Sequence, residues 1–267
     1  MKRIDLKEFA RQELENWPLA RANYEALDHL ETRTVNVDGT PVRLQFNPAR
    51  AVSSQARLDA RSLAARPCFL CAANRPAEQR SIDFYGKYQL LLNPFPITPL
   101  HFTLAATEHR VQRMDNTALN DFLTLAHDME GYTLLFNGAK AGASAPDHFH
   151  FQVTCTDYYH LPLERSTPLI PRRVWTADDP AALRRAWNGT GLDDTLCNFF
   201  ARYEDGCWTL VVFPRRAHRP SQYYDGSLLV SPGAIDMTGT LILTRESDFD
   251  RLTAADIRDI YRQVSMP

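Results

Sequence analysis

The chain has 267 residues, of which 44% are hydrophobic and 23% are charged, and its formal net charge is −2 at pH 7. This composition is close to the average for globular domains and excludes a disordered, collagenous or fibrous chain. Because acidic and basic residues nearly balance, no overall field attracts nucleic acid or an anionic membrane, and we expect neither as a partner. Charges throughout the first 20 residues, and the lack of an uncharged apolar run of about 18 residues, predict a cytoplasmic protein without a signal peptide or membrane span.

The N-terminal part of the chain predicts helices followed by a hairpin. Residues 5–30 have a helical pattern that Pro18 divides into two helices. Residues 34–46 alternate apolar and polar side chains around Asp38-Gly39, a dipeptide typical of tight hairpin turns. We therefore expect two helices and a β-hairpin before residue 46.

The middle of the chain alternates strand and helix patterns. Asp115 is a suitable N-cap for a helix with an apolar stripe that ends near Gly131. Around this helix, apolar runs predict strands over 88–93, 101–105, 132–136 and 148–154. We expect these four strands to share one antiparallel sheet.

A similar but weaker pattern recurs near the C-terminus. It predicts strands over 197–203, 208–213, 227–231 and 239–244, and a helix over 252–264. The fold class is therefore α+β, and the recurrence suggests two related halves. The expected parts are N-terminal helices and hairpin over 1–45, a catalytic half over 46–156, a connection over 157–195 and a smaller α+β half over 196–267.

The segment DHFHFQ at 147–152 carries the sharpest chemical pattern in the chain. His148, His150 and Gln152 alternate along a predicted strand and so point to one face of the sheet. A neutral imidazole can attack a phosphorus atom, and an amide beside it can stabilise charge that develops on the phosphoryl oxygens. The preceding loop NGAKAGASAPD has small residues that allow backbone N–H groups to approach a phosphate. Taken alone, the pattern also fits a half-buried polar strand after a flexible turn.

The segment NGAKAGASAPDHFHFQ resembles the active-site segment of the transferase branch of the histidine-triad superfamily, which includes galactose-1-phosphate uridylyltransferase, diadenosine tetraphosphate phosphorylase and GDP-L-galactose phosphorylase. The segments QFNPAR and NPFPITPLHFTL resemble the same branch, so the resemblance covers roughly residues 45–155. It implies a histidine-triad-like antiparallel sheet with flanking helices. It also implies that His150 is the nucleophile and that Gln152 replaces the third histidine of the hydrolase branch.

Cys68 and Cys71 form a Cys-x-x-Cys pair, a spacing at which two thiolates can bind one tetrahedral zinc. From the residues alone, a redox pair and two buried thiols remain alternatives. Five cysteines, an odd and small number, argue against an extracellular disulfide framework. The resemblance implies that His109 and His148 complete a structural zinc site with the two cysteines.

Small and basic residues near the motif are candidates to bind the substrate. The candidates are Asn137, Gly142, Ser144, Lys140 and Arg50. Arg57 is a further candidate that equally fits a solvated basic surface. The turn PRRAHRP, which contains His218, is either a polar cluster that closes over the substrate or a surface turn.

The resemblance implies a nucleotidyltransferase or nucleotide phosphorylase that acts on a nucleoside diphosphate-sugar or a dinucleoside polyphosphate through a nucleotidyl-histidine. We expect a nucleotide or nucleotide-sugar as substrate, phosphate or a sugar phosphate as acceptor, and a structural zinc. Magnesium can accompany the nucleotide, and the chain can form a homodimer. A histidine-triad hydrolase and a non-catalytic nucleotide-binding protein remain alternatives; Gln152 argues against the first and His150 against the second.

Overall fold

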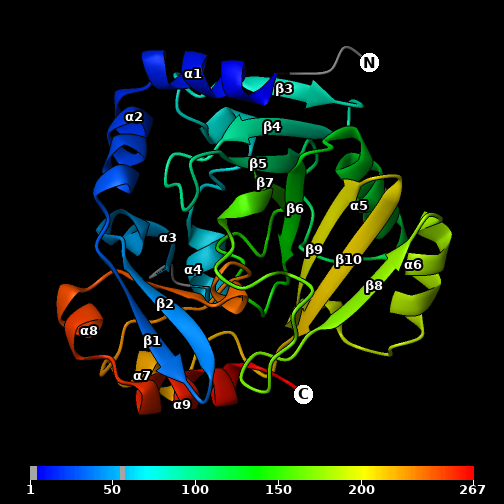
Figure 1. Cartoon of the computed structure of the whole chain (residues 1–267). Helices are drawn as coiled ribbons and strands as arrows, with labels where there is room; N and C mark the ends of the chain where they lie inside the picture. The colour runs from blue at the N-terminus through cyan, green and yellow to red at the C-terminus, as the bar shows by residue number, and fades with distance from the viewer. Residues whose placement is uncertain (1–4, 55–57) are drawn as a thin grey trace.

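The computed structural model describes residues 5–54 and 58–267 (Figure 1). Its main feature is an eight-stranded sheet with the order β3-β4-β5-β7-β6-β9-β10-β8. All neighbouring strands in this sheet are antiparallel, and the four strands predicted to share a sheet lie side by side in it. The predicted α+β class with an antiparallel sheet is thus confirmed. The strands are β3 (Ser81–Phe84), β4 (Tyr88–Leu92), β5 (His101–Ala106), β6 (Tyr132–Asn137), β7 (His150–Cys155), β8 (Arg173–Ala177), β9 (Cys197–Glu204) and β10 (Cys207–Pro214).

A second, three-stranded sheet joins the two ends of the chain. The hairpin of β1 (Thr32–Val37) and β2 (Thr40–Phe46) turns at Asp38 and Gly39, which both have positive φ, at 50° and 81°. Two consecutive positive φ values are the geometry of the tight turn that the sequence predicts. β11 (Thr240–Leu243) pairs with β2 in parallel. The N-terminal hairpin therefore depends on a strand from the C-terminal part of the chain.

Helices flank the sheets, and several start where the sequence predicts. Asp5 and Asp115 accept backbone N–H groups as N-caps, and Pro18 begins the second helix. The helices are α1 (Leu6–Asn16), α2 (Pro18–Glu25), α3 (Ala51–Ser54), α4 (Ala60–Ala65), α5 (Asn116–Asp128), α6 (Pro180–Asn188), α7 (Ser221–Tyr224), α8 (Glu246–Arg251) and α9 (Ala254–Val264). Among the described residues, no helix is long and apolar enough to cross a membrane.

The large sheet separates two apolar cores. On one face, Phe149, Phe151 and Val153 pack in the core that also contains side chains of α1, α2, α5 and α6. On the other face, Phe200 and Phe213 pack with the small sheet, α8 and α9. Because side chains alternate along a strand, the polar residues of β7 between these aromatic side chains face the small sheet. Figure 1 shows the hairpin, α8 and α9 on that side of the molecule.

The second half of the chain continues the same large sheet, because β9 pairs with β6. The predicted connection contains β8 and α6. The proposed division into parts stays a prediction. The strand predicted over 227–231 is wrong: these residues form no strand in the structure. Their backbone bonds locally and to a side chain instead: Val230 N–H donates to the carbonyl of Leu228 at 3.1 Å, and Leu229 N–H donates to Asp248 Oδ2 at 2.9 Å.

Candidate active site

His150 begins β7, and its ring is held in one tautomer. The side chain is only 4% exposed, and its Nδ1 lies 2.8 Å from the carbonyl oxygen of His148. A carbonyl oxygen only accepts, so Nδ1 carries the proton and Nε2 keeps its lone pair. Within the described residues, Nε2 has no hydrogen-bond partner. Burial lowers the pKa of His150 to about 4, so the ring is neutral at physiological pH. A neutral ring with a free Nε2 is the state that nucleophilic attack requires.

Gln112 fixes the backbone around His150, and the sequence reasoning missed it. Its Oε1 accepts the N–H of His150 at 2.8 Å, and its Nε2 donates to the carbonyls of His150 and Asn137 at 2.9 and 3.0 Å. The side chain is fully buried. Gln112 therefore ties the start of β7 to the end of β6, the two strand ends that flank the small-residue loop.

Gln152 lies on the same face of β7 as His150, and a buried histidine orients its amide. His101 Nδ1 accepts the N–H of Ile97 at 3.2 Å, so its Nε2 carries the proton and donates to Gln152 Oε1 at 2.7 Å. Burial lowers the pKa of His101 to about 3, which keeps the ring neutral. With Oε1 engaged, the NH₂ group of Gln152 is turned toward the site. The sequence reasoning did not single out His101, although it is the only histidine in the segment NPFPITPLHFTL.

The loop between β6 and β7 presents backbone donors. Within the described part of the chain, the N–H groups of Gly142, Ala143 and Ser144 have no hydrogen-bond acceptor. Gly142 has a φ of 101°, and a Cβ there would lie 2.5 Å from the Cα of Gly233. Asn137 Oδ1 accepts the N–H of Ala234 at 2.7 Å. The loop is therefore packed against the C-terminal segment, and its unpaired N–H groups can bind an anion.

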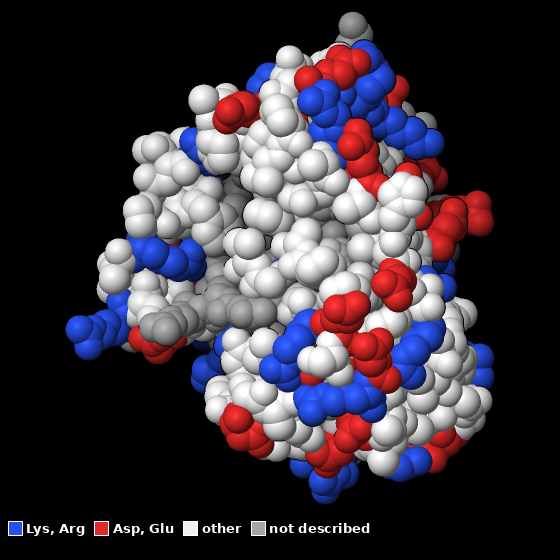
Figure 2. Space-filling model, turned by 90° about the vertical axis from the view of Figure 1, so that its left-hand side faces the viewer, with Lys and Arg blue, Asp and Glu red and all other residues white. Residues whose placement is uncertain are grey.

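Two cavities meet at Arg50, Ser144 and Gln152, which line both of them. The larger has a volume of about 320 Å³ and mainly apolar walls. Its apolar residues include Trp17, Leu19, Phe69, Leu91, Pro94 and Phe95. The smaller has a volume of about 60 Å³ and is mainly polar. Its walls include Asn137, Gly142, His218, Ser231, Gly233 and Asp236. In Figure 2, charged side chains gather at the top and bottom of the face shown, and its hollowed middle is mainly uncharged.

The predicted basic residues have different positions. Arg50 is half-buried, lines both cavities and donates from one guanidinium nitrogen to the carbonyl of Phe95 at 2.6 Å. Lys140 is exposed and is not among the residues that line either cavity. Arg57 lies outside the described residues. The roles of Arg50 and Lys140 in substrate binding stay predictions.

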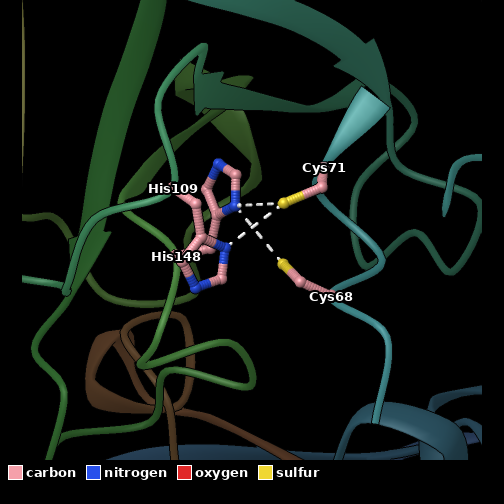
Figure 3. Close-up of side chains that lie close together, drawn as sticks. All are labelled: Cys68, Cys71, His109 and His148. Carbon is pink, nitrogen blue, oxygen red and sulfur yellow. Dashed lines mark hydrogen bonds between the residues drawn. The ribbon is translucent and has the colours of Figure 1, made fainter. Parts of the chain in front are cut away.

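The four predicted metal ligands lie together next to this site. Figure 3 shows Cys68, Cys71, His109 and His148 pointing toward one another. Their ligand atoms all lie within 4.8 Å of one another. Cys68 Sγ is 3.3 Å from His148 Nδ1, and Cys71 Sγ is 3.2 Å from His109 Nδ1. Tetrahedral zinc, with Zn–S of about 2.3 Å and Zn–N of about 2.0–2.1 Å, requires S···N separations of about 3.6 Å.

The ring of His148 is also prepared to bind a metal. Its Nε2 lies 2.9 Å from the carbonyl oxygen of Ala106, so Nε2 carries the proton and donates. Nδ1, the atom that faces the two sulfurs, therefore keeps its lone pair. The donor set of two thiols and two imidazoles, with these separations, fits one tetrahedral zinc ion.

A family model described as "Domain of unknown function (DUF4922)" matches residues 9–155, more than half of the chain. The chain belongs to the DUF4922 family. The matched range contains all four cysteine and histidine positions of the cluster, together with His150 and Gln152. The range ends with β7, so the C-terminal wall of the smaller cavity lies outside it.

Known proteins similar to this DUF4922 chain include a curated relative from Saccharomyces cerevisiae, diadenosine 5',5'''-P1,P4-tetraphosphate phosphorylase 2. It is 27% identical over 139 residues, which cover 47% of this chain and 42% of the relative. The matched segment therefore spans less than half the length of that relative.

Solved structures of yeast Ap4A phosphorylase Apa2 have the same fold. The complex with Ap4A has a TM-score of 0.60 and 18% identity, and the match covers 97% of this chain and 98% of that one. The complex with AMP has a TM-score of 0.58 and 15% identity over 95% and 98% of the two chains. These matches show that the chain has the fold of yeast Ap4A phosphorylase Apa2.

Proposed function

We propose that this DUF4922 protein is a nucleotidyltransferase or nucleotide phosphorylase that works through a nucleotidyl-His150 intermediate. Its substrate is a dinucleoside polyphosphate or a nucleoside diphosphate-sugar. The observation that carries the proposal is the neutral ring of His150, whose Nδ1–H is held by a backbone carbonyl and whose Nε2 is free. The similarity to a yeast Ap4A phosphorylase, and to structures of that enzyme with Ap4A and AMP, supports the substrate class.

The reaction consists of two displacements at one phosphorus atom. In the first, Nε2 of His150 attacks the α-phosphorus, and the bond to the leaving phosphate oxygen breaks. In the second, a phosphate oxygen attacks the same phosphorus, the P–N bond breaks, and its electron pair returns to Nε2. The Gln152 NH₂ group and the loop N–H groups of Gly142, Ala143 and Ser144 stabilise the charge on the equatorial oxygens in both transition states.

The two cavities meet at Gln152 and Ser144, where we place the reacting phosphate. The larger one has walls of apolar and aromatic side chains, including Trp17, Phe69 and Phe95, which suit the base of a nucleotide. Gln152 and Ser144 line both cavities, so a nucleotide whose phosphate binds beside them can place its base in the larger cavity. We assign the base to the larger cavity.

The cysteine and histidine cluster is proposed as a structural zinc site of Cys68, Cys71, His109 and His148. When bound, the zinc would cross-link the loops before β3, after β5 and before β7, and so contribute to folding. His148 connects this site to the nucleophile, because its backbone carbonyl accepts the Nδ1–H of His150. We also propose that magnesium accompanies the nucleotide, that the chain forms a homodimer and that the protein is cytoplasmic.

The nucleophile is tested by labelling. Brief exposure to a substrate labelled at the α-phosphate should leave acid-labile, base-stable label on the wild type and none on His150→Gly. His127→Gly, which removes an exposed histidine on α5, is the matched control and should label fully. Zinc content of His150→Gly should stay near wild type, because no proposed ligand is removed, while its melting temperature should fall because a buried, hydrogen-bonded ring is lost. Persistent label on His150→Gly would show that the nucleophile lies elsewhere.

The same assay separates transfer from hydrolysis. Release of the label should depend on phosphate and should yield a nucleoside diphosphate. Release at the same rate without phosphate, with a nucleoside monophosphate as product, would establish the hydrolase alternative instead.

A further inference from the structure

Arg215 carries a positive charge into the interior of the protein. It is the first arginine of the turn PRRAHRP, it directly follows β10, and its side chain is fully buried. Burial lowers the pKa of Arg215 to about 10, so the guanidinium is still charged at neutral pH. A buried charge is costly unless its surroundings compensate for it, and the hydrogen-bond acceptors of Arg215 therefore need an explanation.

The acceptors of the Arg215 side chain, within the described residues, are all neutral oxygens. One of them is Oδ1 of Asn198, which accepts from Nη1 at 2.6 Å. The others are backbone carbonyls at 3.0 to 3.3 Å, those of Val264, Ala217, His218 and Pro232. A hydrogen bond from a charged donor is stronger than one between neutral groups. Arg215 therefore fixes which end of the Asn198 amide faces the guanidinium.

Asn198 transmits this orientation to Asn137, its cross-strand partner on β6. Asn198 is fully buried, and its Nδ2 donates to Asn137 Oδ1 at 2.9 Å and to the carbonyl of Ala141 at 2.5 Å. Asn137 Oδ1 also accepts the N–H of Ala234 at 2.7 Å. Because two donors hold its oxygen, the amide of Asn137 has one orientation, with the NH₂ group on the remaining side.

This NH₂ group lies on the same face of the sheet as the nucleophile. β6 and β7 pair as far as Leu135 and Gln152, and the same register places Asn137 opposite His150. There the amide of Gln112 donates to the carbonyls of both residues. Side chains of opposed residues share a face, and Asn137 lines the smaller cavity together with Gln152. Within the described part of the chain, Nδ2 of Asn137 has no hydrogen-bond acceptor.

We propose that Arg215 and Asn198 are positioning residues, which hold the NH₂ group of Asn137 toward the reacting phosphoryl group. The inference rests on the proposed function and adds to it two residues outside the range 9–155 that the family model matches. Both side chains are fully buried, and neither lines the two cavities, so they act through Asn137.

The buried charge also makes Asn137 a better donor. Hydrogen bonds in a chain polarise one another, so the guanidinium strengthens the bond from Asn198, which in turn strengthens the donor at the far end. No proton moves along this chain. Its effect is a fixed dipole whose positive end points at the negative charge of the phosphoryl oxygens.

The substitution Asn198→Asp tests the chain with little change in size. The new carboxylate accepts from Arg215 but cannot donate to Asn137 Oδ1 or to the carbonyl of Ala141. The amide of Asn137 should then rotate to donate to the carboxylate, which removes its NH₂ group from the phosphate. Asn120→Asp makes the same change on the exposed surface of α5 and is the matched control.

Isothermal titration calorimetry compares nucleoside monophosphates with nucleosides, using AMP with adenosine and GMP with guanosine. In Asn198→Asp, the affinity for the monophosphate should fall by at least about tenfold, as expected when a hydrogen bond to a charged group is lost. The affinity for the nucleoside should stay near wild type, and Asn120→Asp should bind both ligands as the wild type does. Melting temperature and zinc content verify that each variant is folded.

Two substitutions of Arg215 extend the test to its charge. Arg215→Lys keeps a positive charge and a donor, whereas Arg215→Met keeps only an apolar chain. The preference for monophosphate over nucleoside should be smaller in Arg215→Met than in Arg215→Lys. A wild-type preference in folded Arg215→Met would overturn the role of Arg215, and if this variant does not fold, Asn198→Asp decides the question.

An unchanged preference for the monophosphate in folded Asn198→Asp would overturn the proposal. An equal loss for nucleoside and monophosphate would do the same, since it would indicate a merely structural role. A wild type that binds neither monophosphate more tightly than its nucleoside would also overturn it.

The titration requires no transfer, so its result is independent of the labelling of His150. Labelled wild type together with unaffected binding in Asn198→Asp would refute the positioning role alone. A phosphate preference that is lost in Asn198→Asp, in a protein that is never labelled, would refute the nucleotidyl-His150 mechanism alone.

Discussion

His101 should contribute to nucleotidyl transfer only through Gln152, and the substitution His101→Leu isolates this contribution. The substitution removes the N–H that Gln152 Oε1 accepts at 2.7 Å and the acceptor of the Ile97 N–H. Without the first bond, the amide of Gln152 can rotate and turn its oxygen toward the phosphoryl group. His101 is therefore a positioning residue, since it contacts Gln152 but is not among the residues that line either cavity.

The expected magnitude follows from the single hydrogen bond that orients the amide. A net value of about 0.5–1.5 kcal/mol corresponds to a loss of roughly 2- to 13-fold in kcat. Removal of the donor itself in Gln152→Ala should cost about 10²–10³-fold, as for other donors to a developing oxyanion. Leaving the buried N–H of Ile97 unpaired should also destabilise the fold of His101→Leu by about 1–3 kcal/mol.

A double-mutant cycle measured by single-turnover labelling of His150 provides the decisive comparison. In the Gln152→Ala background, His101→Leu should have no further effect on the labelling rate, while its effect on melting temperature should persist. If the two rate effects are simply additive, His101 does not act through the amide of Gln152, and the argument from the hydrogen-bond chain is wrong.

Three further outcomes are expected. Cys71→Ala should reduce zinc well below one ion per chain and lower the melting temperature; atomic absorption that finds full zinc would contradict the metal site. Gly142→Ala should destabilise the protein by about 1–3 kcal/mol or more, as measured by urea unfolding. The φ of Gly142 is 101°, and the new Cβ would lie 2.5 Å from the Cα of Gly233. Unchanged stability would be inconsistent with this loop packing. Burial lowers the pKa values of His101, His150 and His218 to about 3, 4 and 3. Below about pH 6.5 the unfolded chain therefore binds more protons than the folded protein. The free energy of unfolding should fall as the pH decreases from there, by up to about 1.4 kcal/mol per pH unit for each histidine. Urea unfolding between pH 7.5 and 5 measures this slope, and stability that is independent of pH would refute it.

The sequence predicted those parts of the site that are encoded locally. His150 and Gln152 are two residues apart on one strand, so alternation alone places both on one face. The hairpin at Asp38-Gly39 is likewise determined by two adjacent residues, whose positive φ values the turn requires. The four residues of the metal cluster came from the resemblance, since the spacing of Cys68 and Cys71 identifies only half of a ligand set.

The residues that the sequence did not reveal act across long separations in the chain. His101 and Gln152 are 51 positions apart, and Asn137 and Ala234 are 97 apart. A periodic sequence pattern does not reveal such a pair, because each partner fits the local pattern of its own helix, strand or loop. The strand predicted over 227–231 fails for a related reason: its apolar residues fit a strand pattern, but its backbone groups bond to nearby carbonyls and to the distant side chain of Asp248 rather than to a neighbouring strand.

The pairing of β6 with β9 has a consequence for how this protein can be divided experimentally. A fragment that ends at residue 155 would retain the nucleophile and the cysteine–histidine cluster, but the edge of β6 that normally bonds to β9 would be open. The same fragment would leave β2 without β11. Open strand edges with apolar faces promote aggregation, so such a fragment is a poor reagent for isolating the chemistry of His150. Substitutions in the full chain, rather than truncations, are the suitable way to separate the contribution of each half.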